Sequence, residues 1–342
     1  MSILDLVRNN VKALKPYSSA RDEYQESVSN MVFLDANENP FESGLNRYPD
    51  PQQSILKQEL AKINKVPTQN ILLGNGSDEV LDLIVRAFCE PNIDKIISLP
   101  PTYGMYQVLA NINAIEVVEV PLSSAFQPQV DQILEVSNAK ILFLCSPNNP
   151  TGNSFKQSAI EELLSKFQGI VVLDEAYIDF SDQESWLSRL EEFPNLIITQ
   201  TFSKAYGLAG IRLGICYAST EIISILNKIK SPYNVNQLTQ NSGLERLNNL
   251  QAVYSEIKLI KAEREQLINQ LKTIDFISKI YNSDANFVLV KVDDANLRYK
   301  QLTENNIVIR NRTNQFGCEN CLRLTVGTQA ENLKLINTLK AI

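Results

Sequence analysis

Histidine is absent from the 342 residues of this chain. Its absence excludes Ser-His-Asp and Cys-His nucleophilic catalysis, zinc sites with histidine ligands, and the side chain that most often serves as a general base. An enzyme with this composition must therefore obtain its chemistry from lysine, carboxylates, tyrosine or a cofactor.

Long apolar runs are absent as well. No stretch reaches the ~18 consecutive apolar residues that a membrane-spanning helix needs. Asp5 and Arg8 interrupt the first apolar residues, which is not typical of a secretory signal. The net charge is −7 and the sequence pI is near 5.0, so a basic face for nucleic-acid phosphates is not expected. We therefore expect neither a membrane nor a nucleic acid as a partner.

Cysteine is scarce. The chain has five cysteines, an odd number, and most of them lie in apolar runs, as reduced thiols of cytoplasmic proteins do. Cys318 and Cys321 form a single C-x-x-C without the second pair or the histidines that a zinc site needs, so we expect no bound metal. These observations favour a cytoplasmic protein.

What the chain does contain is a regular alternation of strand-length apolar runs and amphipathic segments. The apolar runs span residues 95–99, 116–120, 140–145, 169–173, 196–200 and 213–218. Helices are expected at 54–65, 103–112, 157–166 and 220–230. This alternation predicts an α/β fold with a mostly parallel sheet covered by helices on both faces.

The length of the chain predicts more than one hydrophobic core. We expect a large domain at residues 46–265 and a smaller α+β domain at 266–342, with one long amphipathic helix at 250–272 leading out of the large domain. The small domain is expected to contain three strands and a final helix, at residues 286–292, 307–310, 322–326 and 329–340. Residues 1–45 are interpreted as an amino-terminal arm that packs with the small domain.

Lys204 lies in the most informative stretch, Thr201-Phe-Ser-Lys-Ala-Tyr-Gly-Leu-Ala-Gly-Ile-Arg-Leu-Gly214. A single lysine is most often a solvent-exposed residue. This lysine closely follows a strand that is predicted to be buried, and Arg212 is the only other charged residue of the stretch. The hydroxyls of Thr201 and Ser203, and the glycines, which permit close approach of the backbone, suit a phosphorylated ligand.

Two other predicted strands are followed by polar side chains that complement Lys204. Asn149 follows the strand at 140–145 within a Ser-Pro-Asn-Asn-Pro-Thr-Gly turn, and Asp174 and Tyr177 follow the strand at 169–173. Taken alone, such an asparagine or aspartate is at least as often a turn or cap residue. Because the carboxyl ends of parallel strands meet at one edge of a sheet, we expect an amine, a carboxylate, an amide and a phenol to lie together.

This set of groups matches pyridoxal 5′-phosphate. The aldehyde of that cofactor condenses with a lysine amine, and a carboxylate keeps its pyridine nitrogen protonated so that the ring can accept the electrons of a carbanion. The phosphate would lie at the helix start formed by Ser77 and Asp78, with Ser203 and Arg212 on its other side. Tyr103, at the start of the next helix, is placed to stack on the ring.

The chain resembles the fold type I pyridoxal-phosphate-dependent aminotransferases, and the matching motifs run through most of its length. They are Pro16-Tyr-Ser-Ser-Ala-Arg21, Asp35-Ala-Asn-Glu-Asn-Pro40, Arg47-Tyr-Pro49, Gly76-Ser-Asp-Glu79, Pro100-Pro-Thr-Tyr-Gly-Met-Tyr106, Cys145-Ser-Pro-Asn-Asn-Pro-Thr-Gly152, Asp174-Glu-Ala-Tyr177, Ser203-Lys204 with Arg212, and Cys321-Leu-Arg-Leu-Thr-Val-Gly327. The Asn-Pro-Thr-Gly and Ser-Lys motifs are shared by many aminotransferases.

The resemblance implies roles for the cofactor-binding residues. Lys204 would hold the cofactor covalently and then carry the proton of the reaction. Asp174 would pair with the ring nitrogen, Asn149 and Tyr177 would hold the ring oxygen, and Tyr103 would stack on the ring. Further cofactor-binding residues would be Ser77, Asp78, Thr201, Ser203 and Arg212.

The resemblance also implies substrate-binding residues. Arg323 and Arg310 match the family's anion-binding arginines, and Tyr17 and Glu38 lie in segments that are expected to close over the substrate. Arg310 is assigned by its spacing from Arg323, and Arg312, two residues later, is the alternative.

The implied reaction is transamination between a phosphorylated amino donor and 2-oxoglutarate in amino-acid biosynthesis. A homodimer is expected to carry it out, in which Tyr48 reaches the phosphate of the partner subunit's cofactor. Two related kinds of enzyme share the cofactor residues and stay open as alternatives, an aromatic amino-acid aminotransferase and a threonine-phosphate decarboxylase. A non-catalytic regulator would need a DNA-binding domain ahead of residue 35 and is not expected.

Overall fold

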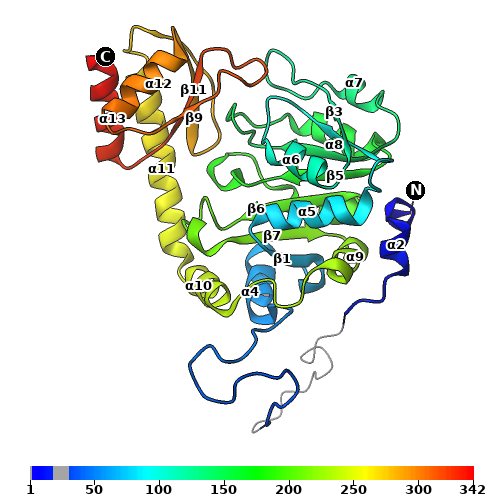
Figure 1. The fold of residues 1–342 in the computed structure, drawn as a ribbon. Coiled ribbons are helices and arrows are strands. Elements are labelled where there is room, and N and C mark those ends of the chain that lie inside the picture. Colours follow the sequence, from blue (N-terminus) through cyan, green and yellow to red (C-terminus); the bar gives the residue numbers. More distant parts are fainter. Residues whose placement is uncertain (1, 18–30) are drawn as a thin grey trace.

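The computed structural model describes residues 2–17 and 31–342 (Figure 1). Part of the motif at residues 16–21 therefore lies outside the described residues. A seven-stranded sheet forms the centre of a large domain, and a four-stranded antiparallel sheet forms the centre of a smaller one. The predicted fold class, a mostly parallel sheet between helices with a smaller α+β domain, is confirmed.

The large sheet positions the strand ends that the sequence singles out. Its strands follow the order β1 (Ile71–Asn75), β7 (Leu213–Ala218), β6 (Leu196–Thr201), β5 (Ile170–Asp174), β4 (Ala139–Cys145), β2 (Lys95–Ser98) and β3 (Glu116–Glu119). From β3 to β6 all neighbours are parallel, whereas β7 runs antiparallel to both β6 and β1. The carboxyl ends of β4, β5 and β6 therefore lie at one edge of the sheet.

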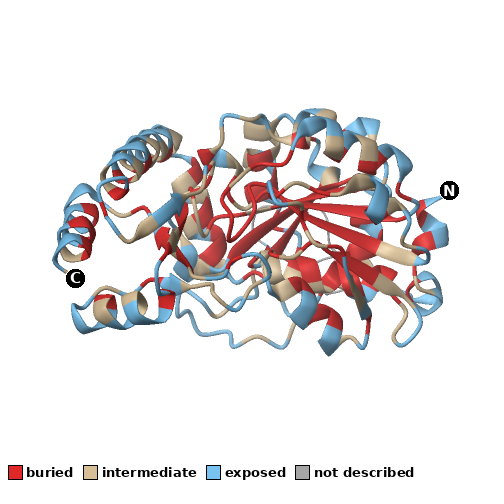
Figure 2. Cartoon of the chain, turned by 90° about the horizontal axis from the view of Figure 1, so that it is seen from above, coloured by how far each residue is buried: buried red, intermediate tan, exposed pale blue. Residues whose placement is uncertain are grey.

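Alternate side chains of each strand face opposite layers of helices, as the two-residue period of a strand requires. In β1, Leu72 packs into one core, while Ile71 and Leu73 pack into the other. The first core includes α5 (Ser77–Phe88), α6 (Met105–Ile112) and α9 (Thr220–Ile229), and the second includes α4 (Ser54–Asn64), α7 (Val130–Leu134), α8 (Gln157–Lys166) and α10 (Gln237–Leu247). Figure 2 shows buried strands between helices whose outer faces are exposed.

The small domain is built on its own core. Its sheet follows the order β10 (Arg310–Asn311), β11 (Cys321–Thr325), β9 (Phe287–Val292) and β8 (Ile277–Ile280), and its helices are α11 (Leu250–Leu271), α12 (Ala295–Glu304) and α13 (Gln329–Ala341). Short 3₁₀ helices occur at η1 (Thr68–Asn70), η2 (Ile178–Phe180), η3 (Trp186–Glu192) and η4 (Ala209–Ile211). None of the helices in the described part of the chain is both long and apolar enough to cross a membrane.

The helix α11 connects the two domains without interruption. Ile257, in its first half, packs against a cluster that contains Phe180 of η2, whereas Leu267, in its second half, belongs to the core of the small domain. Between them, Nη1 of the buried Arg264 donates to the carbonyl oxygens of Phe180 (3.2 Å) and Ala285 (2.9 Å). One guanidinium thus joins a segment of each domain to the helix between them.

The amino-terminal residues lie on the large domain. In α1 (Ile3–Leu6), α2 (Asn9–Ala13) and the turn between them, the buried apolar side chains share a core with α5 and α9. Arg8 pairs with Glu90 at 3.3 Å. The sequence-based placement of this segment beside the small domain is therefore wrong for residues 3–13, because their apolar side chains are covered by α5 and α9 (Figure 1).

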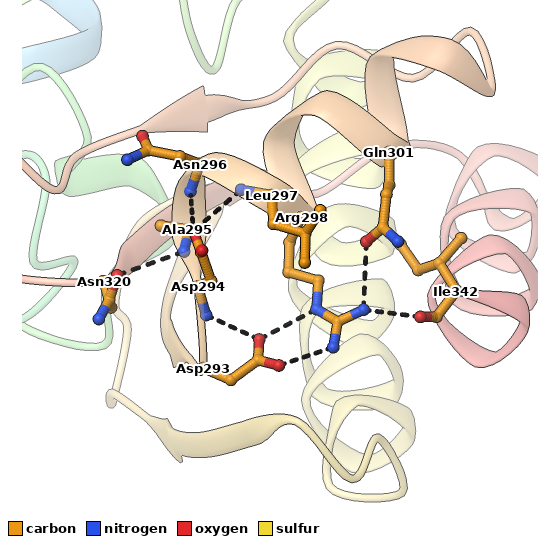
Figure 3. A network of polar contacts seen from close by, with 9 residues as sticks. All are labelled: Asp293, Asp294, Ala295, Asn296, Leu297, Arg298, Gln301, Asn320 and Ile342. Carbon is orange, nitrogen blue, oxygen red and sulfur yellow. Dashed lines mark hydrogen bonds and ion pairs between the residues drawn. The ribbon is translucent and has the colours of Figure 1, made fainter.

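Arg298 ties α12 to α13 in the small domain (Figure 3). Asp294 caps α12 by accepting two backbone N–H bonds, and Arg298, one turn later, forms a two-pronged pair with Asp293 at 3.0 and 2.6 Å. The Nη1 of Arg298 donates to the main-chain oxygen of Ile342 at 2.6 Å, and its guanidinium lies 3.8 Å from the ring centre of Phe276. The start of one helix and the end of the other are thereby held together.

Candidate active site

One cavity collects the polar side chains at the carboxyl-end edge of the large sheet, where β4, β5 and β6 end and α5 begins. It has a volume of about 190 Å³ and is lined by Ser77, Asp78, Tyr103, Cys145, Asn149, Asp174, Ala176, Tyr177, Thr201, Ser203, Lys204, Ala209 and Arg212. Ten of these residues are those that the sequence assigns to the cofactor. The cavity also includes Cys145, Ala176 and Ala209, to which the sequence assigns no role.

Lys204 lies in the loop after β6, and its ammonium is 5.6 Å from the ring centre of Tyr177. Burial lowers the pKa of Lys204, and the positive charge of Arg323 lowers it further, while Asp174 acts in the opposite direction. A lowered pKa increases the share of the neutral amine, which is the form that attacks an aldehyde. The environment of this lysine therefore suits covalent chemistry.

Asp174 is the last residue of β5 and is 3% exposed. Its carboxylate accepts a hydrogen bond from the hydroxyl of Tyr106 (2.7 Å) and one from the backbone N–H of Ala176 (3.1 Å). Burial raises the pKa of Asp174, and these two hydrogen bonds oppose the rise. Among the described residues no ion pair compensates this carboxylate, so the cavity suits a cationic group such as a protonated ring nitrogen.

Tyr106 is a site residue that the sequence reasoning missed. It is fully buried in α6, its ring stacks on Phe143 at 4.6 Å, and the edge of Tyr103 meets it at 5.6 Å. Its hydroxyl reaches Asp174 from the helix layer. The available signal was that Tyr106 lies in the same Pro-Pro-Thr-Tyr-Gly-Met-Tyr motif as Tyr103, although Tyr103 precedes α6 and Tyr106 lies within it.

The start of α5 and Arg212 form an anion-binding corner. No side chain caps the amino-terminal end of α5, so its first backbone N–H groups are available to a negatively charged ligand. The guanidinium of Arg212 donates to Oγ of Ser203 at 3.2 Å. A Cβ atom on Gly214 would lie 2.2 Å from the backbone nitrogen of Ser77, and Gly76 has a φ of +79°, which L side chains rarely adopt, so both positions favour glycine.

The side chain of Asp78 contacts both Tyr103 and Arg212. It accepts a hydrogen bond from the hydroxyl of Tyr103 at 3.0 Å, and its other oxygen lies 3.5 Å from Nη2 of Arg212. Burial raises the pKa of the Tyr103 hydroxyl, and the neighbouring carboxylate of Asp78 raises it further. The phenol of Tyr103 therefore stays protonated and fixed over the cavity.

Asn149 connects the cavity to the small domain. Its side-chain oxygen accepts a hydrogen bond from Nη1 of Arg323 in β11. The guanidinium of Arg323 also lies 5.1 Å from the ring centre of Phe287, and Phe287 packs edge-on against Tyr177. Of the residues assigned to the substrate, Arg323 is thus in direct contact with a residue that lines the cavity.

The other residues predicted for the site lie elsewhere in this single chain. Tyr48 is 52% exposed and stacks on Tyr233 at 4.5 Å. Glu38 accepts hydrogen bonds from Nη1 of Arg47 (2.8 Å) and from the backbone of Tyr48 (2.7 Å), and Tyr17 is exposed at a separate groove. The structure therefore does not bring Tyr48, Glu38 or Tyr17 to the cavity of their own chain.

Arg310 and Arg312 differ in their surroundings. Arg310 lies directly opposite Arg323 in the β10–β11 ladder and is exposed, whereas Arg312 is partly buried. Burial lowers the pKa of Arg312 to about 10, and the positive charges of Arg323 and Arg310 contribute to that decrease. Neither arginine lines the 190 Å³ cavity. Arg310 lies in β10, next to the strand that carries Arg323, and Arg312 follows directly after β10.

The class of this protein follows from comparison with known families. The aminotransferase class I and II family matches residues 22–339, so the chain belongs to this family. Within it, the chain is 63% identical over 340 residues to the histidinol-phosphate aminotransferase of Flavobacterium johnsoniae, covering 98% of this chain and 97% of that protein.

Solved structures agree with this assignment at the level of the fold. The histidinol-phosphate aminotransferase from Clostridium acetobutylicum superposes with a TM-score of 0.81 at 24% identity, covering 87% of this chain and 91% of that one. The histidinol-phosphate aminotransferase from Sinorhizobium meliloti, solved in complex with pyridoxal-5′-phosphate, gives a TM-score of 0.77 at 25% identity and covers 86% and 82%.

Pyridoxal 5′-phosphate is the cofactor of this family and therefore of this protein. The residues of the cavity fit it. A lysine with a lowered pKa matches the aldehyde, the uncompensated buried carboxylate of Asp174 matches the ring nitrogen, and the uncapped start of α5 with Ser203 and Arg212 matches the phosphate.

Proposed function

We propose that the protein transfers the amino group of L-histidinol phosphate to 2-oxoglutarate, giving imidazole acetol phosphate and L-glutamate, in histidine biosynthesis. The observation that supports this most is the single cavity that holds ten of the predicted cofactor-binding residues and contacts Arg323 through Asn149. The high identity to an enzyme named for this substrate supports the choice of donor.

The cofactor, when bound, supplies an aldehyde carbon for attachment of the amino group and a ring that withdraws electrons from the adjacent carbon. Lys204 would hold the cofactor, and its amine, once free, would accept the proton of the substrate carbon and return it. Asp174 would keep the ring nitrogen protonated, and the hydroxyl of Tyr106 and the backbone N–H of Ala176 orient its carboxylate. Tyr103 would pack against the ring.

Substrate recognition rests on arginine. Because the chain has no histidine, arginine and lysine are its cationic side chains for anions, and the guanidinium fork matches phosphate and carboxylate oxygens. Arg323 is held by Asn149 at the edge of the cavity. It would bind the phosphate of the donor in the first half-reaction and a carboxylate of 2-oxoglutarate in the second.

We further propose a cytoplasmic homodimer. All five cysteines are free and buried, which supports a reducing compartment. The segment around Tyr48 exposes large apolar side chains, at Val32, Leu34 and Phe41 among others, as surfaces that pack against a second subunit do.

The experiment that tests the donor compares kcat/KM for histidinol phosphate, histidinol, phenylalanine and tyrosine with saturating 2-oxoglutarate. Histidinol phosphate is expected to be preferred by at least about 100-fold, because unpaired arginines are left in the site when the phosphate is missing. A preference for phenylalanine or tyrosine would establish the aromatic aminotransferase instead. Release of carbon dioxide from O-phospho-L-threonine would establish the decarboxylase.

A further inference from the structure

Two of the five cysteines lie side by side in the small domain. Cys318 and Cys321 are both buried and form a cluster with Leu289, against which the ring of Tyr281 packs. The backbone N–H of Cys321 donates to the carbonyl oxygen of Cys318 at 2.9 Å, which closes a four-residue turn. Such a turn keeps the Cα atoms of its first and last residues within ~7 Å, and a disulfide joins Cα atoms ~4.4–6.8 Å apart. The backbone of this turn is therefore compatible with a disulfide.

The two thiols interact directly with each other. A hydrogen bond between them raises the pKa of Cys318 and lowers the pKa of Cys321. Burial opposes the decrease in the pKa of Cys321, and a hydrogen bond with the hydroxyl of Tyr281 adds to it. In the other three cysteines burial raises the pKa, and these are Cys89, Cys145 and Cys216. Because the thiolate is the reactive form, Cys321 is the cysteine of this chain best suited to oxidation.

The pair lies beneath a surface loop. Gly317 and Glu319, the two neighbours of Cys318 in the chain, are exposed, and so is the ring of Phe316. A local opening of this loop is therefore enough to let a small oxidant reach the thiols. Cys216 differs in this respect, because it lies in β7, between β1 and β6 inside the large sheet.

The pair also adjoins the strand that contacts the cofactor cavity. Cys321 is the first residue of β11, and Leu289 of the same cluster lies opposite Arg323 in the β9–β11 ladder. Nη1 of Arg323 donates to the side-chain oxygen of Asn149 in the cavity wall. A disulfide brings its sulfur atoms closer than a non-bonded contact allows, so the start of β11 must shift when it forms. In a close-packed interior this shift is transmitted to Arg323 and its contact with Asn149.

We propose that Cys318 and Cys321 form a redox modification site, and that their disulfide lowers the activity of the enzyme by displacing β11. The thiolate of Cys321 attacks one oxygen of a peroxide such as hydrogen peroxide, which converts the thiolate to a sulfenic acid and releases hydroxide. The thiol of Cys318 then attacks this sulfur, so that the S–S bond forms and its proton leaves with the sulfenic hydroxyl as water. A dithiol reductant reverses the reaction. In a reducing compartment such a disulfide is transient, as in redox-sensing proteins.

Treatment of the holoenzyme with hydrogen peroxide tests the site, because alkylation of the denatured protein counts the thiols that remain. The number of alkylated cysteines should fall from five to three, since two become joined to each other. Peptide mass spectrometry should find the link between Cys318 and Cys321. The kcat/KM for histidinol phosphate should fall about 3- to 10-fold and recover with dithiothreitol, because small displacements at a site of this kind reduce the rate.

Single substitutions separate this site from the other cysteines. Cys318→Ser and Cys321→Ser should each abolish the reversible loss of activity, whereas Cys89→Ala, which changes a buried cysteine at the end of α5, should retain it. The proposal is overturned if both thiols remain free after treatment, if peroxide links another pair, or if the disulfide forms without a change in activity. Thiol counting and mass spectrometry involve no substrate, so they still decide where the bond forms if histidinol phosphate is not the donor. Should one serine variant lose its native near-UV circular dichroism, the other decides.

Discussion

Asp174 illustrates how single residues of the site are tuned by their neighbours. Its carboxylate is buried without an ion-pair partner in the described part of the chain, and two hydrogen-bond donors hold it in place. Burial of this charge destabilises the folded protein, and a cation bound beside the carboxylate would offset that cost. The same burial that penalises the free carboxylate would thus strengthen its proposed interaction with a protonated ring.

Replacing Asp174 by asparagine should reduce kcat/KM by about 100-fold or more, because a neutral amide cannot keep the ring nitrogen protonated. Folding should be affected much less, since the substitution removes a buried charge and keeps the shape of the side chain. Steady-state kinetics and thermal unfolding of the same preparation measure both effects, with the exposed Asp131→Asn as the control. Activity within a few-fold of the wild type would mean that this carboxylate has another role.

At the scale of elements, Glu175 connects the end of β5 to η3 and β6 through hydrogen bonds. Its carboxylate accepts hydrogen bonds from the hydroxyl of Ser185, the backbone N–H of Trp186 (2.9 Å) and the side chain of Gln200 (3.0 Å). Burial raises its pKa from 4.5 to about 7, and the hydrogen bonds from Ser185 and Trp186 reduce that rise. The turn that carries Ala176 and Tyr177 into the cavity begins at this residue.

The raised pKa of Glu175 predicts a pH-dependent stability. The folded state favours the protonated acid, so this contribution to the free energy of unfolding is fully present below pH ~4.5 and is lost as pH rises through about 7. Glu175→Gln should remove this dependence, which amounts to about 3 kcal/mol across the window at most. Urea unfolding at pH 5, 6, 7 and 8 measures it, with the exposed Glu191→Gln as control. Parallel pH curves for the wild type and Glu175→Gln would contradict the prediction.

The elements differ in how far the sequence predicts them. Helix α8 was predicted with the bounds that it has, because apolar residues recur along one face of it. Helix α10 (Gln237–Leu247) was missed, because its sequence is polar and it is held by tertiary burial of Thr239, Gln240 and Gly243. The strand predicted at residues 307–310 shrinks to Arg310–Asn311, since Ile307 instead hydrogen-bonds back to Leu302 at the end of α12.

The residues of the site also differ in how far the sequence predicts them. Residues at strand ends, such as Asp174 and Lys204, were predicted because strand direction alone brings them to one edge. The burial of Arg312 and the contact of Tyr106 with Asp174 depend on packing between segments that are far apart in sequence. A single sequence holds no signal for such distances.

At the scale of the whole molecule, the position of the arm around Tyr48 bears on the proposed homodimer. Residues 31–48 extend from the large domain beyond α4 (Figure 1), and Tyr48 does not line the cavity of its own chain. Its exposed ring stacks only on Tyr233 among the described aromatic residues. We therefore expect Tyr48 to act across a subunit interface.

Mixing inactive Lys204→Ala chains with inactive Tyr48→Ala chains should restore activity. In a heterodimer, one of the two sites combines an intact lysine with an intact tyrosine from the other chain, so random exchange should recover about a quarter of wild-type activity. Activity measured after dissociation and reassociation of the mixture tests this, with each variant reassociated alone as the control. Absence of recovery, or a fully active monomer, would contradict the arrangement.

The uninterrupted course of α11 has a mechanical consequence. The helix has 22 residues and is about 33 Å long. Arg264, in its second half, donates hydrogen bonds to Phe180 and Ala285 and so connects a segment of each domain to the helix. Residues 250–271 contain no proline or glycine at which the helix would bend easily. Rotation of one domain against the other by bending α11 would therefore break some of its internal hydrogen bonds. We therefore expect the proposed exchange of a phosphate ester for 2-oxoglutarate to involve movement of arginine side chains and not bending of α11.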